Sequence, residues 1–363
     1  MGAKGSAQSH MTISVFDHPI LSTLLGDEEV SRAFSVEADV RAILAFEKAL
    51  ASAQAVLGVI PAEAAARIAE ACDKFSPETA KLANGVAQDG VIAPTLVKLL
   101  REEVAEPYAA KVHLGATSQD AIDTSLVLRL KPLVGSFATR LDALIALLRA
   151  IEAEQGATPL MGRTRMQRAL PIHAADKVRG WREPLQRHSR RLAELRERLL
   201  VIQFGGAVGV RGNLDGRGDA IAAELARLLE LNNGPCWQVQ RDCLAEFAGW
   251  LSLVSGTLGK IGQDVAILAQ NEISEVKLAG GGASSAMAHK SNPVGAEILV
   301  TLARFNSTLL AAQHQSLIHE NERSGTAWTL EWLVLPQMLA ATGAALRHAS
   351  TVCSGLRFVA AAV

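Results

Sequence analysis

Aromatic residues are scarce in this chain: Phe, Trp and Tyr together make up 4% of its 363 residues, and Tyr occurs once. Neither sign of charge dominates, and the net charge of -1 argues against nucleic acid or an anionic membrane as a partner. No apolar run is long enough to cross a bilayer without charges. The cysteines form no Cys-x-x-Cys pair, so a reduced cytoplasmic compartment is expected; they are Cys72, Cys236, Cys243 and Cys353.

What the chain has in abundance is alanine and leucine, which are strong helix formers. Its length is enough for two domains or one large one. Residues 1–10 have the composition of an expression leader and are set aside. Residues 11–110 predict a small N-terminal helical domain, in which Ser35 caps a helix over 36–57. Residues 111–363 are expected to form a central domain of long helices.

Five long helical patterns dominate this second domain. In each, apolar residues recur at three- and four-residue steps, which indicates one buried stripe along a helix. The patterns cover residues 119–154, 174–202, 241–276, 293–320 and 327–350. No alternation typical of a β-strand reaches a useful length. We therefore expect an all-α fold built on a bundle of five unusually long helices.

The third pattern has the most regular apolar seam. It consists of Leu244, Phe247, Leu251, Val254, Leu258, Ile261, Val265 and Leu268. Gly256, Gly259 and Gly262 follow at three-residue spacing and predict a groove of small residues where another helix can approach closely. Helices this long leave more apolar surface than one protomer can cover, so we expect self-association. An elongated monomer is the alternative, and seams without a polar break argue against it.

A glycine-rich stretch, Leu-Ala-Gly-Gly-Gly-Ala-Ser-Ser-Ala-Met-Ala-His-Lys-Ser-Asn-Pro-Val over residues 278–294, separates two of the helical patterns. It carries hydroxyls that include Ser284, a cation at Lys290 and an amide at Asn292, and Pro293 can open the next helix. Such a loop can close over an anion and act on it. Three glycines alone would equally suit a surface linker.

The combination Ser-Ser-x-Met-x-x-Lys-x-Asn-Pro in this loop resembles the signature loop of the fumarase/aspartase superfamily. That family usually has Gly and Pro where this chain has Ala283 and Ala288. A second stretch, His-Leu-Gly-Ala-Thr-Ser-Gln-Asp-Ala-Ile-Asp-Thr over residues 113–124, opens the first long helix. By itself it suits simple helix capping, which is very common. It also resembles the second characteristic region of the same superfamily, and together the two matches are specific.

Three further segments carry the same resemblance. Gly-Arg-Thr-Arg-Met-Gln over 162–167 is similar to the family region that holds an acid/base histidine in lyase members, and here that position is Arg165. Residues 203–209 resemble the family's Gly-Gly-Ala-Val-Gly helix end. Glu-Arg-Ser-x-x-Ala-Trp-x-x-Glu-Trp-x-x-Leu-Pro over 322–336 resembles one branch, the 3-carboxy-cis,cis-muconate cycloisomerases. The resemblance runs from about residue 16 to the C-terminus, although the family's further small C-terminal helical domain is expected to be absent.

Arg165 separates the reactions of this superfamily. Loss of an amine or hydroxide needs a proton donor, whereas a carboxylate already leaves as a stable anion. Arginine cannot act as an acid or base at neutral pH, since its pKa exceeds about 12. The substitution therefore favours lactonisation of a muconate, in which the substrate's own carboxylate adds to a double bond. Arg165 can instead bind a substrate carboxylate, or serve as a structural ion-pair partner.

The resemblance implies a role for each site residue. Ser284 exchanges the proton with carbon, Lys290 and Asn292 hold the carboxylate that takes up charge, and other candidates bind the remaining carboxylates. These candidates are Thr117, Ser118, Gln167, Arg165, His113 and Arg323. The family builds each site from three chains of a tetramer and uses neither a metal nor a cofactor. His113 is also compatible with an ordinary, fully bonded histidine.

The expected activity is conversion of 3-carboxy-cis,cis-muconate, a small tricarboxylate, to 4-carboxymuconolactone in protocatechuate breakdown, the β-ketoadipate pathway. Two alternatives stay open. One is a lyase of the adenylosuccinate or argininosuccinate type that releases fumarate, which Arg165 disfavours. The other is a structural relative without activity, motivated by the altered loop and the missing C-terminal domain.

Overall fold

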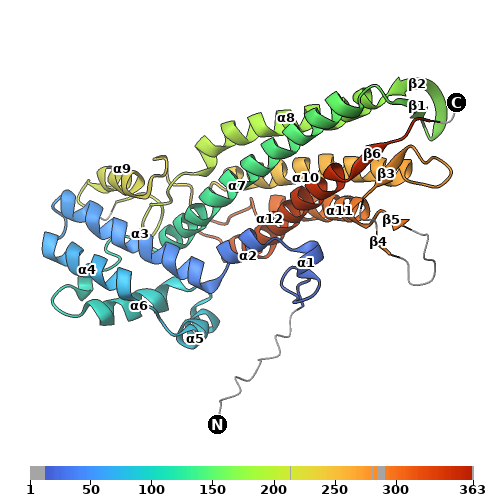
Figure 1. Cartoon of the computed structure of the whole chain (residues 1–363). Helices are drawn as coiled ribbons and strands as arrows, with labels where there is room; N and C mark the ends of the chain where they lie inside the picture. The colour runs from blue at the N-terminus through green and yellow to red at the C-terminus, as the bar shows by residue number, and fades with distance from the viewer. Residues whose placement is uncertain (1–12, 213, 280–281, 284–290, 362–363) are drawn as a thin grey trace, which may run out of the picture.

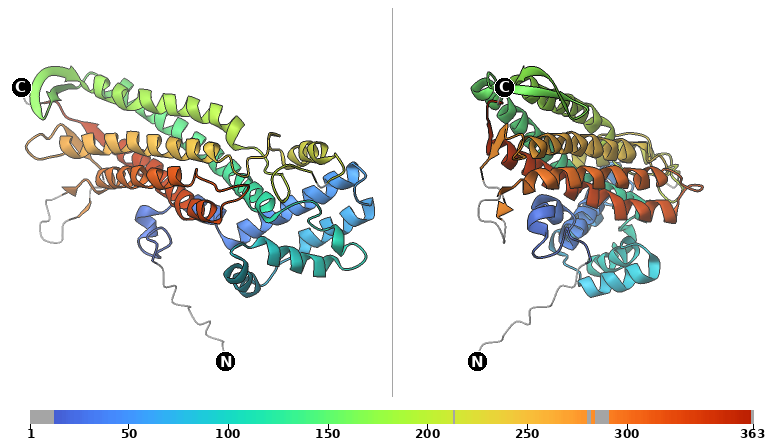
Figure 2. Two further views of the ribbon diagram at one scale, coloured as in Figure 1. Left: turned by 180° about the vertical axis from the view of Figure 1, so that it is seen from behind. Right: turned by 90° about the vertical axis from the view of Figure 1, so that its right-hand side faces the viewer.

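The computed structural model describes residues 13–212, 214–279, 282–283 and 291–361. Over these residues the chain is an elongated, mostly helical body in which long helices run side by side (Figure 1). Most of the shorter helices gather at one end, and three small two-stranded sheets lie at the other. The view from behind in Figure 2 shows the same division between the two ends. The predicted expression leader lies outside the described residues.

Five long helices form the bundle, as the sequence predicts. They are α7 (Ser118–Gln155), α8 (Ala174–Leu199), α10 (Asp242–Leu268), α11 (Val294–Gln315) and α12 (Gly325–Ser354). The predicted seam of α10 is buried along its whole length, from Leu244 to Leu268. Helix α10 packs against α8, α11 and α12, and α7 packs against α8 and α12. Burial of these apolar stripes stabilises the bundle because each removes apolar area from water.

The short helices precede α7 or lie between α8 and α10. They are α1 (Ser22–Leu25), α2 (Glu28–Ala33), α3 (Val36–Val56), α4 (Ala62–Lys74), α5 (Thr79–Asp89), α6 (Ala93–Val104), the 3₁₀ turn η1 (Ala109–Lys111) and α9 (Gly218–Leu229). Ser35 caps α3 as predicted, and its side chain accepts a hydrogen bond from the Ala38 N–H. Helix α3 packs against α4, α7 and α9, so the N-terminal helices are joined to the base of the bundle.

The groove of small residues on α10 is confirmed for two of its three glycines. A Cβ atom at Gly259 would collide with Ala303 of α11, and one at Gly262 would collide with the Ala296 carbonyl of the same helix. Gly256 has open space in this direction. Helix α11 therefore sits closer to α10 than larger residues would allow.

The expectation of a chain without strands was wrong. Strands β1 (Pro159–Thr164) and β2 (Gln167–His173) form a hairpin between α7 and α8, where the sequence shows no alternating pattern. Strands β3 (Val276–Leu278) and β6 (Leu356–Phe358) pair, as do β4 (Gly282–Ala283) and β5 (Ser291–Asn292). The predicted third helix also ends earlier, at Leu268 rather than 276, since the chain turns there into β3. The fourth helix ends at Gln315 rather than 320.

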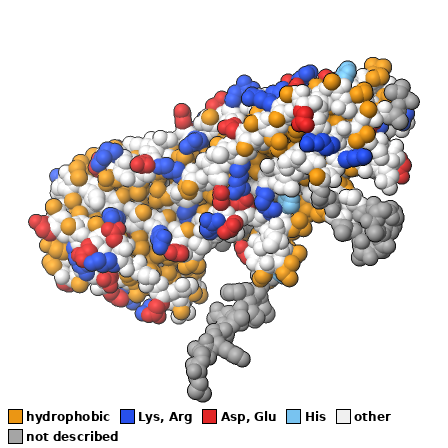
Figure 3. Space-filling model, in the orientation of Figure 1, with side chains coloured by type: hydrophobic (Ala, Val, Ile, Leu, Met, Phe, Trp, Pro, Cys, Tyr) orange, Lys and Arg blue, Asp and Glu red, His pale blue; other side chains and the backbone are white. Residues whose placement is uncertain are grey.

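The surface carries no strong field of one sign on the face shown in Figure 3, where basic and acidic side chains are interspersed. Within the described residues one helix, α11, is long and apolar enough by composition to cross a membrane. It contains Glu297 and Arg304, and charged side chains in the middle of a membrane are costly. Of its most apolar 18-residue stretch, 22% is buried within this chain.

Candidate active site

At the beginning of α7, several groups that favour negative charge lie close together. Thr117 is the N-cap residue, and its backbone N–H donates to the Asp120 carboxylate at 3.0 Å in a capping box. Arg323 Nη2 donates to Thr117 Oγ1 at 2.7 Å, and Arg323 Nε donates to Gln119 Oε1 at 3.2 Å. A hydroxyl, a guanidinium and the N-terminus of a 38-residue helix thus meet at one place. We call Thr117, Ser118 and Arg323 the carboxylate cradle, because helix N-termini and arginine both favour negative charge.

Asp120 holds this cradle against the loop that follows α8. Its carboxylate accepts hydrogen bonds from the Gly205 N–H at 2.8 Å, the Gly206 N–H at 2.9 Å and Gln203 Nε2 at 3.0 Å. Burial raises the pKa of Asp120 to about 6, against the lowering effect of these donors. The predicted Gly-Gly-Ala-Val-Gly segment therefore has a structural partner, which is the capping carboxylate of α7.

A fully buried ion network fixes the segment that supplies Arg323. Arg241, at the start of α10, donates to Asp123 Oδ2 at 2.6 Å and to Glu331 Oε1 at 2.9 Å. The Trp328 indole N–H donates to Asp123 Oδ1 at 3.0 Å. Trp328 also packs edge-on against Trp332, as the i, i+4 spacing predicts. This network could not be predicted from the sequence, because Arg241 stands at a helix start, where an exposed charge is usual.

His113 lies four residues before Thr117 and is held by a group from the N-terminal helices. Its Nδ1 is 2.5 Å from Oε1 of Glu47 on α3, and the Glu47 side chain is 1% exposed. The backbone of His113 is left-handed, with φ of 62°, which is uncommon for a residue with a Cβ atom. His113, Thr117 and Ser118 are close in sequence, and the hydrogen bond to Thr117 places Arg323 beside them at one end of the bundle.

The other predicted residues lie at the opposite end. Arg165 and Gln167 belong to the β1–β2 hairpin, and Asn292 belongs to β5 (Figure 1). Arg165 and Gln167 are exposed, and neither side chain bonds to any residue that the structure describes. Ser284 and Lys290 lie outside the described residues. The pairing of Gly282 with Asn292 joins the two sides of the segment that carries them.

Strand β6 fastens the hairpin and this loop to each other. It pairs with β3, two residues before Gly280, and the Ala361 N–H donates to the Pro159 carbonyl at the start of the hairpin. Arg163 of the hairpin donates to Glu275 at 2.6 Å, and that carboxylate is 2% exposed. The two segments that resemble substrate-binding regions are thus held in fixed register at one end of the molecule.

A broad cavity of about 940 Å³ lies beside the base of the loop. It is lined by polar and apolar residues from the end of α10, by Asn292, Ser291, Pro293 and Lys277, and by the carboxylates Glu272 and Glu297. Lys277 is an exposed cation on β3 that the motif search did not identify, since it stands outside the matched stretch. It adds positive charge next to a segment that already has Lys290 in its sequence.

The two groups of residues cannot meet within one chain. Helix α10 has 27 residues and spans about 40 Å at 1.5 Å per residue. The Arg241 network stands at its beginning, while β3 and the hairpin lie beyond its end (Figure 2). The two groups of predicted residues therefore lie at opposite ends of the bundle, and we call them half-sites because each contains part of the predicted site.

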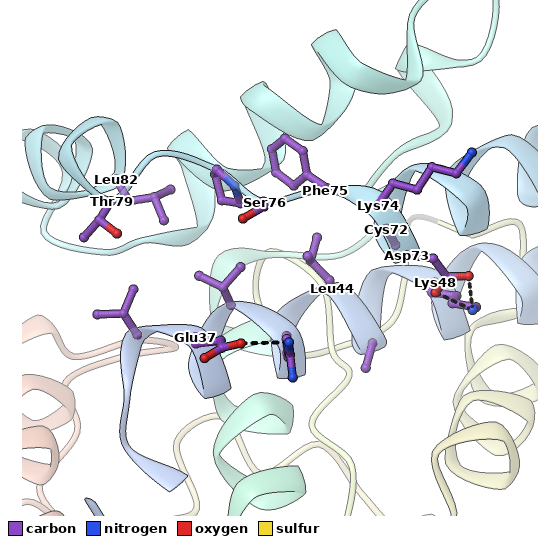
Figure 4. A pocket seen from close by; sticks show the side chains of 15 residues that line it. Glu37, Leu44, Lys48, Cys72, Asp73, Lys74, Phe75, Ser76, Thr79 and Leu82 are labelled. Carbon is purple, nitrogen blue, oxygen red and sulfur yellow. Dashed lines mark hydrogen bonds and ion pairs between the residues drawn. The ribbon is translucent and has the colours of Figure 1, made fainter. Parts of the chain in front are cut away.

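A cavity of about 870 Å³ between α3, α4 and α5 is a poor candidate for the site (Figure 4). Its cations are paired with carboxylates, including Lys48 with Asp73 at 2.7 Å. Burial raises the pKa of the Cys72 thiol to about 12, so this sulfur is no nucleophile. Within the described ranges no three His, Cys, Asp or Glu residues cluster closely enough to hold a metal ion.

Comparison with known proteins identifies the family. Residues 26–305 match the model of the lyase family. A 3-carboxy-cis,cis-muconate cycloisomerase of Pseudomonas aeruginosa is 43% identical, over 89% of this chain and 72% of that protein. The crystal structure of the lactonizing enzyme for 3-carboxy-cis,cis-muconate from Pseudomonas putida superposes with a TM-score of 0.88, at 38% identity over 94% of this chain and 77% of that one. A fumarate lyase structure from Mesorhizobium gives 0.86 at 33% identity, over 92% and 76%. The chain therefore belongs to the lyase family of the fumarase/aspartase superfamily.

Proposed function

We propose that this protein is an isomerase that converts 3-carboxy-cis,cis-muconate to 4-carboxymuconolactone in protocatechuate breakdown. The observation that carries the proposal is the placement of Arg165. It stands in the tight turn between β1 and β2 with φ of 49°, is exposed, and has no partner among the described residues. A structural ion pair within the chain therefore does not account for it. The similarity to a 3-carboxy-cis,cis-muconate cycloisomerase and to a lactonizing enzyme for the same substrate supports this conclusion.

The chemistry follows from the charge of the substrate. One carboxylate oxygen of the muconate forms a C–O bond to a carbon of the double bond, and the electron pair moves to the carbon next to another carboxylate. That carboxylate takes up the charge, and a proton delivered to the carbon completes the lactone. Substrate and product are isomers as free acids; the trianion takes up one proton from solvent in each turnover, and no other reactant is consumed. Cationic and amide donors stabilise the charge as it develops.

Each half-site supplies part of this environment. The carboxylate cradle of Thr117, Ser118 and Arg323 binds one spectator carboxylate. Arg165 binds the carboxylate that adds to the double bond, and Gln167 from the same hairpin assists. By resemblance, Lys290 and Asn292 hold the carboxylate that takes up charge, and Ser284 exchanges the proton. A tricarboxylate matches this number of anion-binding groups.

We also propose that the half-sites are completed by other copies of the chain in a tetramer. Of the most apolar stretch of helix α11, 22% is buried within this chain, and several of its apolar side chains are only partly covered. Met166 and Leu170 on the hairpin are 76% and 73% exposed, which is unusual for large apolar side chains beside charged ones. In a tetramer the hairpin of one chain can reach the cradle of another. Residues 11–110 would then form the N-terminal domain, and 111–363 the domain that assembles. The free cysteines suit the cytoplasm.

The test is a substrate panel with purified protein. Loss of the ultraviolet absorbance of 3-carboxy-cis,cis-muconate, with formation of the lactone, is expected at catalytic protein concentrations. Ser284→Ala is the negative control. No loss of absorbance at micromolar protein contradicts the proposal.

A lyase that releases fumarate is the second candidate, favoured by the structural match to a fumarate lyase. Its leaving group would need a proton donor where this chain has Arg165. Fumarate release from adenylosuccinate by the same preparation, with muconate left unchanged, would select this candidate instead.

A further inference from the structure

The buried carboxylate of Glu47 lies near the cradle and has no role in the proposed reaction. Glu47 lies in the middle of α3. Its Oε2 is buried without a partner among the residues that the structure describes, while Oε1 is bonded to the His113 ring. Leaving one carboxylate oxygen unpartnered away from water is costly. A charge kept at such a position needs a function, and the contact that it makes is with the predicted substrate-binding histidine.

Besides Glu47, two other side chains form hydrogen bonds to the segment that carries His113. On α3, Gln54 stands two turns after Glu47, and its Nε2 donates to the Leu114 carbonyl at 2.6 Å. On α6, Arg101 donates to the Val112 carbonyl at 3.0 Å. These bonds hold the backbone on both sides of His113 in its left-handed conformation, which is unfavourable for a residue with a Cβ atom. The surrounding structure therefore fixes the direction of this ring.

The ring is bonded on one side only. Nδ1 faces Glu47, whereas Nε2 has no partner among the described residues and is not an enclosed polar atom. The side chain of His113 is 12% exposed, so a small opening leads from Nε2 to solvent. The cradle residue Thr117 follows one turn later, and Ala116 N–H donates to the His113 carbonyl at 3.3 Å.

We propose that Glu47 is a positioning residue that holds His113 as an imidazolium, with its Nε2–H available to a substrate carboxylate beside the Thr117–Arg323 cradle. This proposal rests on the proposed function for the identity of the ligand. The Glu47–His113 contact itself is independent of it. Glu47 does not touch the substrate, and it acts through the charge and the orientation of the ring.

The groups around the ring support this assignment. Burial alone would lower the pKa of His113, but the charge and the hydrogen bond of Glu47, with a contribution from Asp120 on α7, raise it above its usual value. Arg101 on α6 opposes them. Because the pKa is higher in the folded chain, the pair stabilises the fold below pH about 6.5, and this contribution is lost as pH rises through the folded pKa.

The experiment measures the ring directly. Proton NMR of the histidine Cε1–H signals against pH gives the pKa of each of the nine histidines, and the signal missing in His113→Asn identifies His113. In the intact protein, His113 should titrate above about 6.5. In Glu47→Gln, which keeps the shape and removes the charge, it should titrate at least one unit lower. An unchanged pKa in this variant overturns the proposal whether or not the protein turns over muconate.

Kinetics provide the second readout. At pH 7.5, Glu47→Gln should raise KM for the tricarboxylate about tenfold with a smaller effect on kcat, and the defect should shrink as pH is lowered and the ring regains its proton. His113→Asn should raise KM to the same extent at every pH, and adding Glu47→Gln to it should change nothing further. Additive effects of the two substitutions contradict the proposal.

Two further variants separate this role from folding. Asp73→Asn removes an exposed ion pair between α3 and α4 and should leave both KM and the His113 titration unchanged. Glu47→Asp retains the charge at a shorter reach and should retain the raised pKa in part. If Glu47→Gln fails to fold, the Glu47→Asp titration decides: a His113 pKa below its usual value in that variant overturns the proposal.

Discussion

The two ends of the long-helix bundle differ in how far this chain completes them. At the beginning of α7, Thr117, Asp120 and Asp123 are fully bonded to groups of the same chain. At the far end, Arg165 and Gln167 are exposed and without partners among the described residues. The first half-site is thus preorganised before any ligand or second chain arrives. The second half-site has its polar groups exposed, so they are available to a ligand or to another chain.

This contrast explains why the bundle is so long. A helix of about 40 Å separates the half-sites by more than any small tricarboxylate can span. In the tetramer that we propose, the outward half-site of one protomer would lie beside the cradle of another. On that proposal, catalysis depends on assembly.

The largest effect is expected from Ser284→Ala. Removal of the group that exchanges the proton with carbon should lower kcat by about 10³-fold or more, while helicity measured by circular dichroism stays unchanged. Ser291→Ala, in the paired base of the same loop, is the matched control and should retain most of the activity. Full activity in Ser284→Ala would remove the serine loop from the mechanism.

Arg241→Met should lower the free energy of unfolding, because it disrupts the preorganised end of the bundle. It leaves the Asp123 and Glu331 carboxylates buried without their cation, and breaking such a network costs about 3–5 kcal/mol. Chemical denaturation gives the free energy of unfolding. Arg198→Met, which removes an exposed pair with Glu246, is the control and should leave the midpoint nearly unchanged. Equal midpoints for the two variants would mean that the network is not needed for the fold.

Arg165→Ala should weaken substrate binding at the other end of the bundle without changing the stability of the fold. We expect kcat/KM to fall about 10- to 100-fold, the loss that charge-assisted hydrogen bonds of roughly 1.5–3 kcal/mol imply, at unchanged melting temperature. Arg165→Lys should not restore it, because lysine lacks the bidentate geometry. Arg168→Ala on the same hairpin is the control. A lower melting temperature with normal kinetics would assign Arg165 a structural role.

Of these substitutions, Leu170→Glu should change the folded protomer least. This side chain is 73% exposed on the hairpin, so a charge there should leave the protomer folded and weaken the tetramer. Analytical ultracentrifugation should show dissociation at concentrations where the unaltered protein is assembled. Val56→Glu, at an equally exposed apolar site at the end of α3, should not dissociate it. Identical sedimentation of the two variants would exclude the hairpin from the interface.

The helices were predictable because their apolar stripes are long and regular. The seam from Leu244 to Leu268 specifies both the helix and its buried face, and each of its residues is buried. The hairpin was not predictable, since its two strands are stabilised by the Arg163–Glu275 pair and by β6 rather than by an alternating pattern. Contacts between residues distant in sequence left no local signal.

The site was predictable in its members and not in its arrangement. Motif resemblance identified Thr117, Arg165 and Arg323, but only the length of the bundle shows that they fall into two groups. Glu47 escaped prediction because a glutamate on an amphipathic helix usually faces solvent, whereas here it is buried against His113.

The central claim is that each active site joins half-sites of different chains, and subunit mixing tests it most directly. Ser284→Ala inactivates one end, and Arg323→Ala removes the guanidinium at the other. The two inactive variants are dissociated, mixed and reassembled, and cycloisomerase activity is measured beside each variant reassembled alone. The account predicts that activity returns in the mixture, because some sites then combine two intact half-sites. A reassembled mixture as inactive as either variant alone would contradict it.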